Sequence, residues 1–167
     1  MPEAWPRDGR GYGVSVRIGD EVAELLARGV ATIVASRDEE LRPEIARGWG
    51  INLDTDRGQA TLCIEAAEGS TMRSNLEGNG AIAVTCSLPT SYRTIQLKGE
   101  AFDLRAPTPE QLVDVERHAE AFAHEAEQVG LPTGAGRRLV DPELTAVTFS
   151  VRELYDQTPG PSAGSPL

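Results

Sequence analysis

The chain has 167 residues, which suits one domain with a single hydrophobic core and not two full domains. Its formal net charge of -10 argues against a protein that coats DNA or RNA, because such binding needs clustered Lys and Arg. Its N-terminus lacks the apolar core of a signal peptide, and no apolar run approaches the length of a membrane span. We therefore expect a globular cytoplasmic protein without nucleic-acid or membrane partners.

The first part of the chain predicts a short helix followed by a β-hairpin. Asp20 can cap the helix, and Gly29 is placed to end it. β-Branched and small residues then predict strands at 30–36 and 42–52 on either side of a polar turn. A third strand is expected over 59–66, where apolar residues alternate with Thr61 and Cys63.

A second short helix is expected to begin at Ser70, between the third strand and a fourth at 81–88. Ser70 and Thr71 open this helix, and Arg73 lies in its first turn. The first backbone N–H groups of a helix lack intrahelical partners, and the helix dipole is positive there. This entrance is therefore a candidate site for a phosphate group.

The rest of the chain predicts one more strand, a long helix and a final strand. A hairpin leads into the fifth strand at 91–104, which is apolar on one face and polar on the other. Thr108, Pro109 and Gln111 form a strong start for a helix that runs to about residue 129. The apolar residues of this helix are expected to be buried, namely Leu112, Val115, Ala119, Phe122 and Ala126. The last strand is expected at 144–154.

Six strands with short turns predict a mainly β fold, a closed or nearly closed antiparallel barrel with flanking helices. An open sheet covered by the long helix is the alternative. The domain should span residues 20–156, after an N-terminal extension at 1–19 and before a Pro/Gly/Ser-rich tail at 157–167. Cys63 and Cys86 lie in apolar runs and are expected to be buried, reduced thiols, and no metal site is predicted.

This order of strands and helices resembles the pyridoxamine 5'-phosphate oxidase-like family of FMN-binding split barrels. The similar segments cover most of the chain between residues 30 and 104, and a short C-terminal one is added at 156–161. They are Arg42 to Gly50, Ser70 to Leu88, Tyr92 to Gly99, and Asp156 to Pro161. Members are typically homodimers that hold FMN at the subunit interface.

The resemblance implies a small-molecule substrate and a set of cofactor contacts. The phosphate of FMN would lie near Ser70, Thr71 and Arg73, with Arg47 as a further cation. Gln96 and Lys98 would address the polar edge of the flavin ring. Tyr92 and Arg93 are the candidate substrate contacts, and no catalytic residue is assigned.

The alternative interpretation of each candidate is an ordinary structural role at the surface, without ligand binding. Ser70, Thr71 and Arg73 would then belong to an ordinary capped helix, and Arg47 to a cross-strand ion pair with little effect on stability. Gln96 and Lys98 would form an exposed polar face. The aromatic Trp49 is expected to be a packing residue.

One departure from the family pattern leaves the function open. Thr71 and Met72 stand where the family often has a basic pair. The leading hypothesis is a homodimeric flavin-dependent oxidoreductase that acts on a small organic substrate. The alternative is a non-catalytic protein that binds a flavin, a haem or a metabolite. FMN is the first choice of cofactor, with haem, FAD, a deazaflavin or no cofactor as alternatives.

Overall fold

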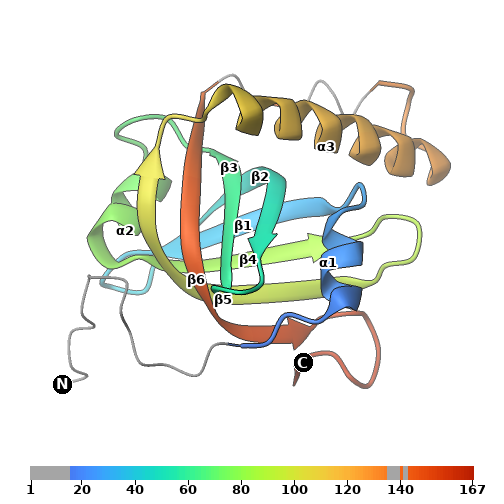
Figure 1. The fold of residues 1–167 in the computed structure, drawn as a ribbon, viewed down its shortest axis with the longest axis horizontal. Helices are drawn as coiled ribbons and strands as arrows, with labels where there is room; N and C mark the ends of the chain where they lie inside the picture. The colour runs from blue at the N-terminus through green and yellow to red at the C-terminus, as the bar shows by residue number, and fades with distance from the viewer. Residues whose placement is uncertain (1–15, 135–139, 141–142) are drawn as a thin grey trace.

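The computed structural model describes residues 16–134, 140 and 143–167, which form an antiparallel barrel with helices around it (Figure 1). Six strands follow the order β3-β2-β1-β4-β5-β6, and β3 also pairs with β6, which closes the sheet. Their bounds are β1 Ala31–Arg37, β2 Pro43–Asp54, β3 Gln59–Glu65, β4 Ala81–Ser87, β5 Thr94–Arg105 and β6 Leu144–Asp156. The predicted closed barrel is confirmed, and the alternative of an open sheet is wrong.

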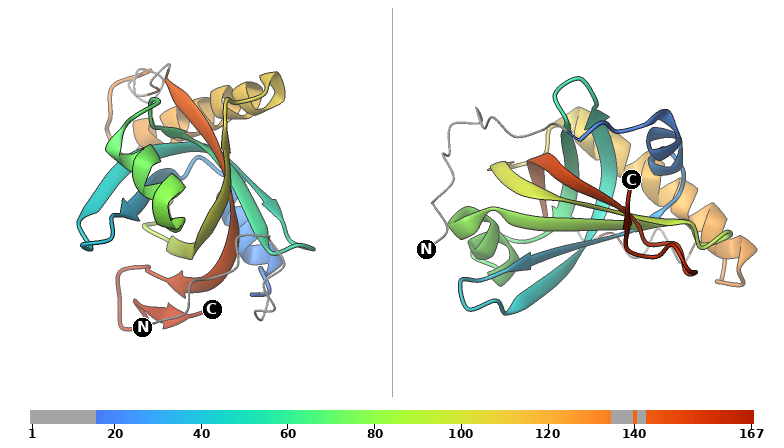
Figure 2. Two further views of the ribbon diagram at one scale, coloured as in Figure 1. Left: turned by 90° about the vertical axis from the view of Figure 1, so that its left-hand side faces the viewer. Right: turned by 90° about the horizontal axis from the view of Figure 1, so that it is seen from below.

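In the part of the chain that the structure describes, three helices surround the barrel. Helices α1 (Asp20–Leu26) and α2 (Thr71–Asn79) lie at its opposite ends, and α3 (Pro109–Gln128) lies across one side (Figures 1 and 2). Helix α3 begins with the predicted capping box of Thr108 and Gln111. The prediction that Asp20 caps α1 was wrong: Gly19 is the N-cap, and Asp20 is the first helical residue, where its negative charge suits the positive end of the helix dipole.

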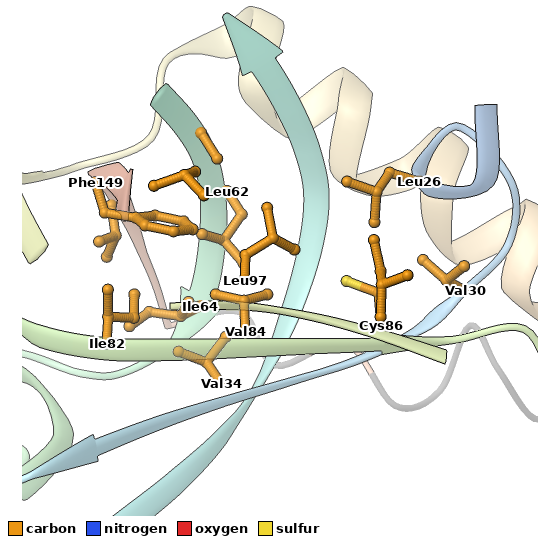
Figure 3. Close-up of a cluster of buried hydrophobic side chains, with 14 of the residues drawn as sticks. Leu26, Val30, Val34, Leu62, Ile64, Ile82, Val84, Cys86, Leu97 and Phe149 are labelled. Atoms are coloured by element: carbon orange, nitrogen blue, oxygen red, sulfur yellow. The ribbon is translucent and has the colours of Figure 1, made fainter. Parts of the chain in front are cut away.

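The core fills the inside of the barrel with aliphatic side chains from every strand (Figure 3). Val34, Leu97 and Phe149 are completely buried, and α1 and α2 add apolar residues such as Leu26 and Leu76 at the two ends. This arrangement follows from the alternation of apolar and polar residues, because only one face of each strand points inward. Among the described residues, no helix is long and apolar enough to cross a membrane.

A β-bulge interrupts the pairing of β5 with β6. Lys98 pairs with Glu153, but the next residue, Gly99, pairs with Val151. Arg152 is the extra residue, so two residues separate the buried Val151 from the buried Leu154. The bulge therefore adds a residue to the outer face. After it, the alternation of inward and outward side chains is shifted by one residue, so that Leu154 points into the core.

A second apolar cluster attaches α3 to the outside of the barrel. Trp49 of β2 is 3% exposed, lies edge-on to Phe122 at 6.0 Å between ring centroids, and donates from Nε1 to Glu65 at 2.9 Å. The predicted packing role of Trp49 is thus confirmed. Leu112 was wrongly predicted as buried, because it is 44% exposed on the turn of α3 that extends past this cluster.

The C-terminal tail returns to the barrel as a short strand, β7 (Ser165–Pro166), that pairs with the end of β6. The Asp156 carboxylate accepts hydrogen bonds from the backbone N–H of Thr158 at 2.8 Å and from the Ser162 hydroxyl at 3.4 Å. These hydrogen bonds hold the pKa of Asp156 below its usual value. The tail stays outside the core, as predicted, but it is not detached.

His118 of α3 is buried between two backbone groups. Its Nδ1 accepts from the N–H of Gly50 at 2.8 Å, and its Nε2 donates to the carbonyl of Val30, also at 2.8 Å. This arrangement requires the neutral ring, because Nδ1 must keep a lone pair for Gly50. Burial lowers the pKa of His118, although the hydrogen bond with Val30 opposes that shift.

We expect His118 to make the fold less stable at mildly acidic pH. The unfolded chain takes up a proton on this histidine below about pH 6.5, whereas the folded chain resists it until a lower pH. The free energy of unfolding should therefore be fully retained above pH 6.5 and fall as the pH drops toward 5. Urea denaturation at pH 7.5 and 5.5 measures this. His118→Gln should flatten the dependence, and a pH dependence in His118→Gln equal to that of the wild type would contradict the assignment.

Candidate functional site

Helix α3 covers only one side of the barrel, which leaves an open face on the outer surface of β1, the first half of β2, β4, β5 and the second half of β6. Among the described elements, no helix lies over the middle of these strands when the molecule is seen from below (Figure 2, right). A groove of about 660 Å³ runs across this face. That volume falls within the range of small-molecule sites, roughly 300–1,000 Å³.

Small side chains form the floor of the groove. Ala35 of β1 pairs with Ala83 of β4, and Ala83 pairs with Lys98 of β5. Ala81 and Gly99 continue the floor toward α2. A row of alanines across neighbouring strands leaves a flat, apolar surface on which a planar ring can lie, because no larger side chain rises from it.

Charged side chains form the walls of the groove. They are Arg37 from β1, Lys98 and Glu100 from β5, and Arg152 and Glu153 from β6. The groove thus holds more cations than carboxylates on a chain whose net charge is -10. An anionic ligand would find this face more favourable than the rest of the surface.

Lys98 is the only lysine of the chain, and its side chain position is defined by an aromatic ring. Its Nζ lies 4.9 Å from the centroid of the Tyr155 ring, and the Tyr155 hydroxyl donates to the Glu153 carboxylate. This hydrogen bond raises the pKa of Tyr155. The three side chains form a connected polar group beside the groove, with the ammonium held over the ring face by a cation–π contact.

Gln96 and Arg47 lie on the same open face, one row from the groove. Gln96 donates from Nε2 to the hydroxyl of Thr85 at 2.9 Å, and Thr85 and Arg47 both pair with Ile33 of β1. The structure therefore places three of the predicted cofactor contacts on one face, namely Arg47, Gln96 and Lys98, with Arg47 three strands away from Gln96. Their location on one face of adjacent strands agrees with the polar alternation in β5.

The other three predicted cofactor contacts lie in the first turn of α2. Ser70 caps the helix by accepting from the N–H of Arg73 at 3.3 Å, and Thr71 is exposed. The Arg73 guanidinium donates from Nε to Glu77 at 2.7 Å. This pair raises the pKa of Arg73, so its charge already has a carboxylate partner within the helix.

The end of α2 that borders the groove is its C-terminal end. Ala81, which lines the groove, directly follows the left-handed C-cap Gly80, and Asn79 donates to the carbonyl of Arg37 at 2.8 Å. The first turn, around Thr71, lies about 12 Å farther along the helix. The structure therefore does not bring the α2 entrance together with the groove.

The predicted substrate contacts Tyr92 and Arg93 lie in the turn between β4 and β5, at the opposite end of β4 from α2. Tyr92 has φ +58° and is 68% exposed, and Arg93 donates to Glu21 of α1 at 3.0 Å. The length of β4, about 20 Å, separates them from the start of that strand at Ala81. Residues 91–93 belong to the turn, so β5 begins three residues later than predicted.

Sequence reasoning missed the groove residues Arg37, Arg152 and Glu153. Strict alternation after the buried Val151 points Arg152 outward and Glu153 inward, so Glu153 joins Arg152 on the outer face only because of the bulge. Gly99 was the available signal, since a glycine inside a strand often marks a bulge. The predicted strand at 30–36 stops one residue before Arg37, which is the last residue of β1.

The remaining reactive side chains lie away from the groove. Cys63 and Cys86 are free and buried, as predicted, and burial raises their pKa values to about 11 and about 12. Such thiols stay protonated and unreactive at neutral pH. Among the described residues, no group of three or more His, Cys, Asp or Glu side chains is arranged to hold a metal ion.

No protein-family model and no curated protein sequence matches the chain, but solved structures do. An F420 reductase matches with a TM-score of 0.53 and 14% identity, over 82% of this chain and 98% of that one. A putative pyridoxamine 5'-phosphate oxidase from Lactobacillus delbrueckii matches with a TM-score of 0.52 and 9% identity, over 83% and 93%. HupZ from Group A Streptococcus matches with a TM-score of 0.51 and 19% identity, over 88% and 99%. The chain therefore has the split-barrel fold of the pyridoxamine 5'-phosphate oxidase-like proteins.

Proposed function

We propose that the protein is a flavin-dependent oxidoreductase of the pyridoxamine 5'-phosphate oxidase-like type that acts on a small organic substrate. The observation that carries this proposal is the groove on the open face, with its flat alanine floor and cationic walls. FMN is the proposed cofactor, because it combines a planar heterocycle with a phosphate group. The fold alone does not decide the activity, so the proposal depends on the chemistry of this groove.

The groove residues fit a flavin in two respects. The row of Ala35 and Ala83 would support the ring, and Gln96, one row from the groove, would offer a hydrogen-bond donor to its polar edge. When bound, the flavin supplies the hydride or electron transfer, while the protein binds and orients it. The chain's own contribution would be the position of the ring, the exclusion of water from one of its faces, and a cationic environment.

We further propose that the protein is a homodimer that uses the open face as its interface. The face carries Ile33 and Ile45, which are 36% and 66% exposed. Both flank the groove residue Ala35 in the sheet. Ile33 lies two residues before Ala35 in β1, and Ile45 pairs with Ala35 from β2. Exposed apolar side chains beside a ligand groove are typical of interaction surfaces. A second copy would cover the groove and shield the outer side of the ring.

The alternatives are distinguished by their own chemistry. Haem is less well supported than flavin, because no His, Cys or Met is found among the groove residues that the structure describes. The F420 reductase among the structural neighbours makes a deazaflavin the second choice of cofactor. A non-catalytic flavin-binding protein would use the same groove but would not convert a substrate.

Titration of the protein with FMN, followed by flavin fluorescence quenching, tests the proposal. We expect saturable binding in the micromolar range or tighter, and reduction of the bound flavin by NADH or NADPH. Ala83→Leu should weaken binding at least about tenfold, because its larger side chain would rise from the groove floor. The matched control is Ala163→Leu, on an exposed position of the tail, which should bind like the wild type.

Two results would count against the proposal in different ways. No saturable binding up to high micromolar FMN, or equal binding by Ala83→Leu and the wild type, would overturn the flavin groove. Tight binding without reduction by either nicotinamide donor, and without activity on a substrate panel, would favour the non-catalytic alternative.

A further inference from the structure

We infer that the phosphate of bound FMN is held in the groove by Lys98 and Arg152, and not by the N-terminus of α2. This inference rests on the proposed function and specifies how its site recognises the ligand. It differs from the contacts that the family resemblance implies, which place the phosphate at Ser70, Thr71 and Arg73. The geometry of β5 and β6 carries it.

The first argument is the direction of the two groove cations. Lys98 and the paired Glu153 face outward across β5 and β6, and the bulge adds Arg152 to the same lining. Without the extra residue, Glu153 would point inward and Leu154 outward, so the groove would lose one wall. The bulge therefore places an ammonium and a guanidinium on adjacent strands, whose backbones lie about 5 Å apart, along one side of a flat floor.

The second argument is the chemistry of these two cations. A guanidinium offers a planar fork of donors that matches phosphate oxygens, and an ammonium adds three donors and a compact charge. The Glu153 carboxylate accepts from the Tyr155 hydroxyl, and the Tyr155 ring lies under the Lys98 ammonium. This network holds Lys98 at the groove wall.

The third argument is the position of the competing site. The first turn of α2, with Ser70 and Arg73, lies about 12 Å along the helix from the end that borders the groove. The helix end beside the groove is the C-terminal one, where unpaired carbonyls disfavour an anion. A phosphate attached to a ring on the alanine floor therefore meets Lys98 and Arg152 before it meets the α2 entrance.

The experiment compares FMN with riboflavin, which has the same ring without the phosphate, in matched charge-removing variants. Lys98→Gln and Arg152→Gln should each weaken FMN binding at least about tenfold and change riboflavin binding less than about twofold. Lys98→Arg should keep FMN affinity within about threefold. Arg73→Gln, which removes the same charge at the α2 entrance, should bind FMN within twofold of the wild type, and thermal melts confirm that each variant is folded.

The single lysine allows an independent measurement. An amine-acetylating reagent can label only Lys98 and the N-terminal amine, so mass spectrometry reports directly on the groove wall. Saturating FMN should slow acetylation of Lys98 at least about fivefold while the labelling rate of the N-terminal amine stays constant. An unchanged rate at Lys98 in the presence of bound FMN would overturn the inference.

The outcomes separate this inference from the proposed function. If the wild type binds FMN, and Arg73→Gln weakens that binding while Lys98→Gln does not, the flavin proposal stands and the phosphate is bound at α2. If Lys98→Gln weakens riboflavin as much as FMN, Lys98 contacts the ring and the inference is wrong. If the wild type binds neither flavin, the proposed function itself fails.

Discussion

Replacing Gly99 with alanine is expected to lower the free energy of unfolding by at least about 3 kcal/mol, or to prevent folding. A Cβ atom at this position would lie 1.8 Å from the carbonyl oxygen of Ser150 and 2.9 Å from its carbonyl carbon. Both are backbone atoms of β6, so the clash cannot be relieved by turning a side chain. The close approach of β5 and β6 at the bulge therefore requires glycine.

Urea denaturation of purified Gly99→Ala measures this effect, with Gly78→Ala as the matched control. Gly78 lies in α2, and a Cβ atom there meets nothing within 4 Å. The control should be unchanged or more stable by roughly 0.5–1 kcal/mol, because alanine favours a helix more than glycine does. Similar stability of the two variants would show that the bulge does not depend on Gly99. If Gly99→Ala folds, FMN binding should also weaken, since the bulge places Arg152 in the groove.

Replacing Trp49 with alanine is expected to cost about 3–5 kcal/mol, the usual range for a large buried aromatic residue. Trp49 fills the contact between β2 and α3, with its ring edge-on to His118 at 5.7 Å and to Phe122 at 6.0 Å. Its removal would also leave Glu65 without the hydrogen bond from the indole. The cavity would loosen the attachment of α3 to the barrel.

Chemical denaturation and amide hydrogen exchange of α3 measure this second effect. Leu112→Ala is the matched control, because Leu112 lies on the same helix but is 44% exposed, and should change stability by less than about 0.5 kcal/mol. Faster exchange confined to α3 in Trp49→Ala is the expected pattern. A Trp49→Ala protein as stable as the control would mean that α3 is attached by other contacts.

Local patterns in the sequence predicted most of the elements. Alternating apolar residues located all six barrel strands to within about three residues, and the capping residues Ser70 and Thr108 marked the starts of α2 and α3. These signals act between residues that are close in the chain, so they can be interpreted without knowing the fold. The cap of α1 was misplaced by one residue, because a glycine serves there without a side-chain hydrogen bond.

The candidate groove was predicted only in part. Gln96 and Lys98 were expected on the polar side of β5, and the structure places Lys98 in the groove and Gln96 one row away. The prediction for Arg73 did not include the ion pair with Glu77, although their spacing of four residues allows one on a helix. Arg152 and Glu153 were not recognised as a pair, because a bulge depends on the partner strand.

The amino-acid sequence by itself determined the order of strands and helices, their inner and outer faces, and the main caps, because hydrophobic periodicity and capping act over a few residues. Only the tertiary structure decided which outer face stays uncovered and where the groove lies. That choice depends on contacts between distant segments, namely Trp49 with α3 and Gly99 with Ser150. These contacts exist only after the barrel has closed, and they leave Lys98 and Arg152 together on the side that α3 does not cover.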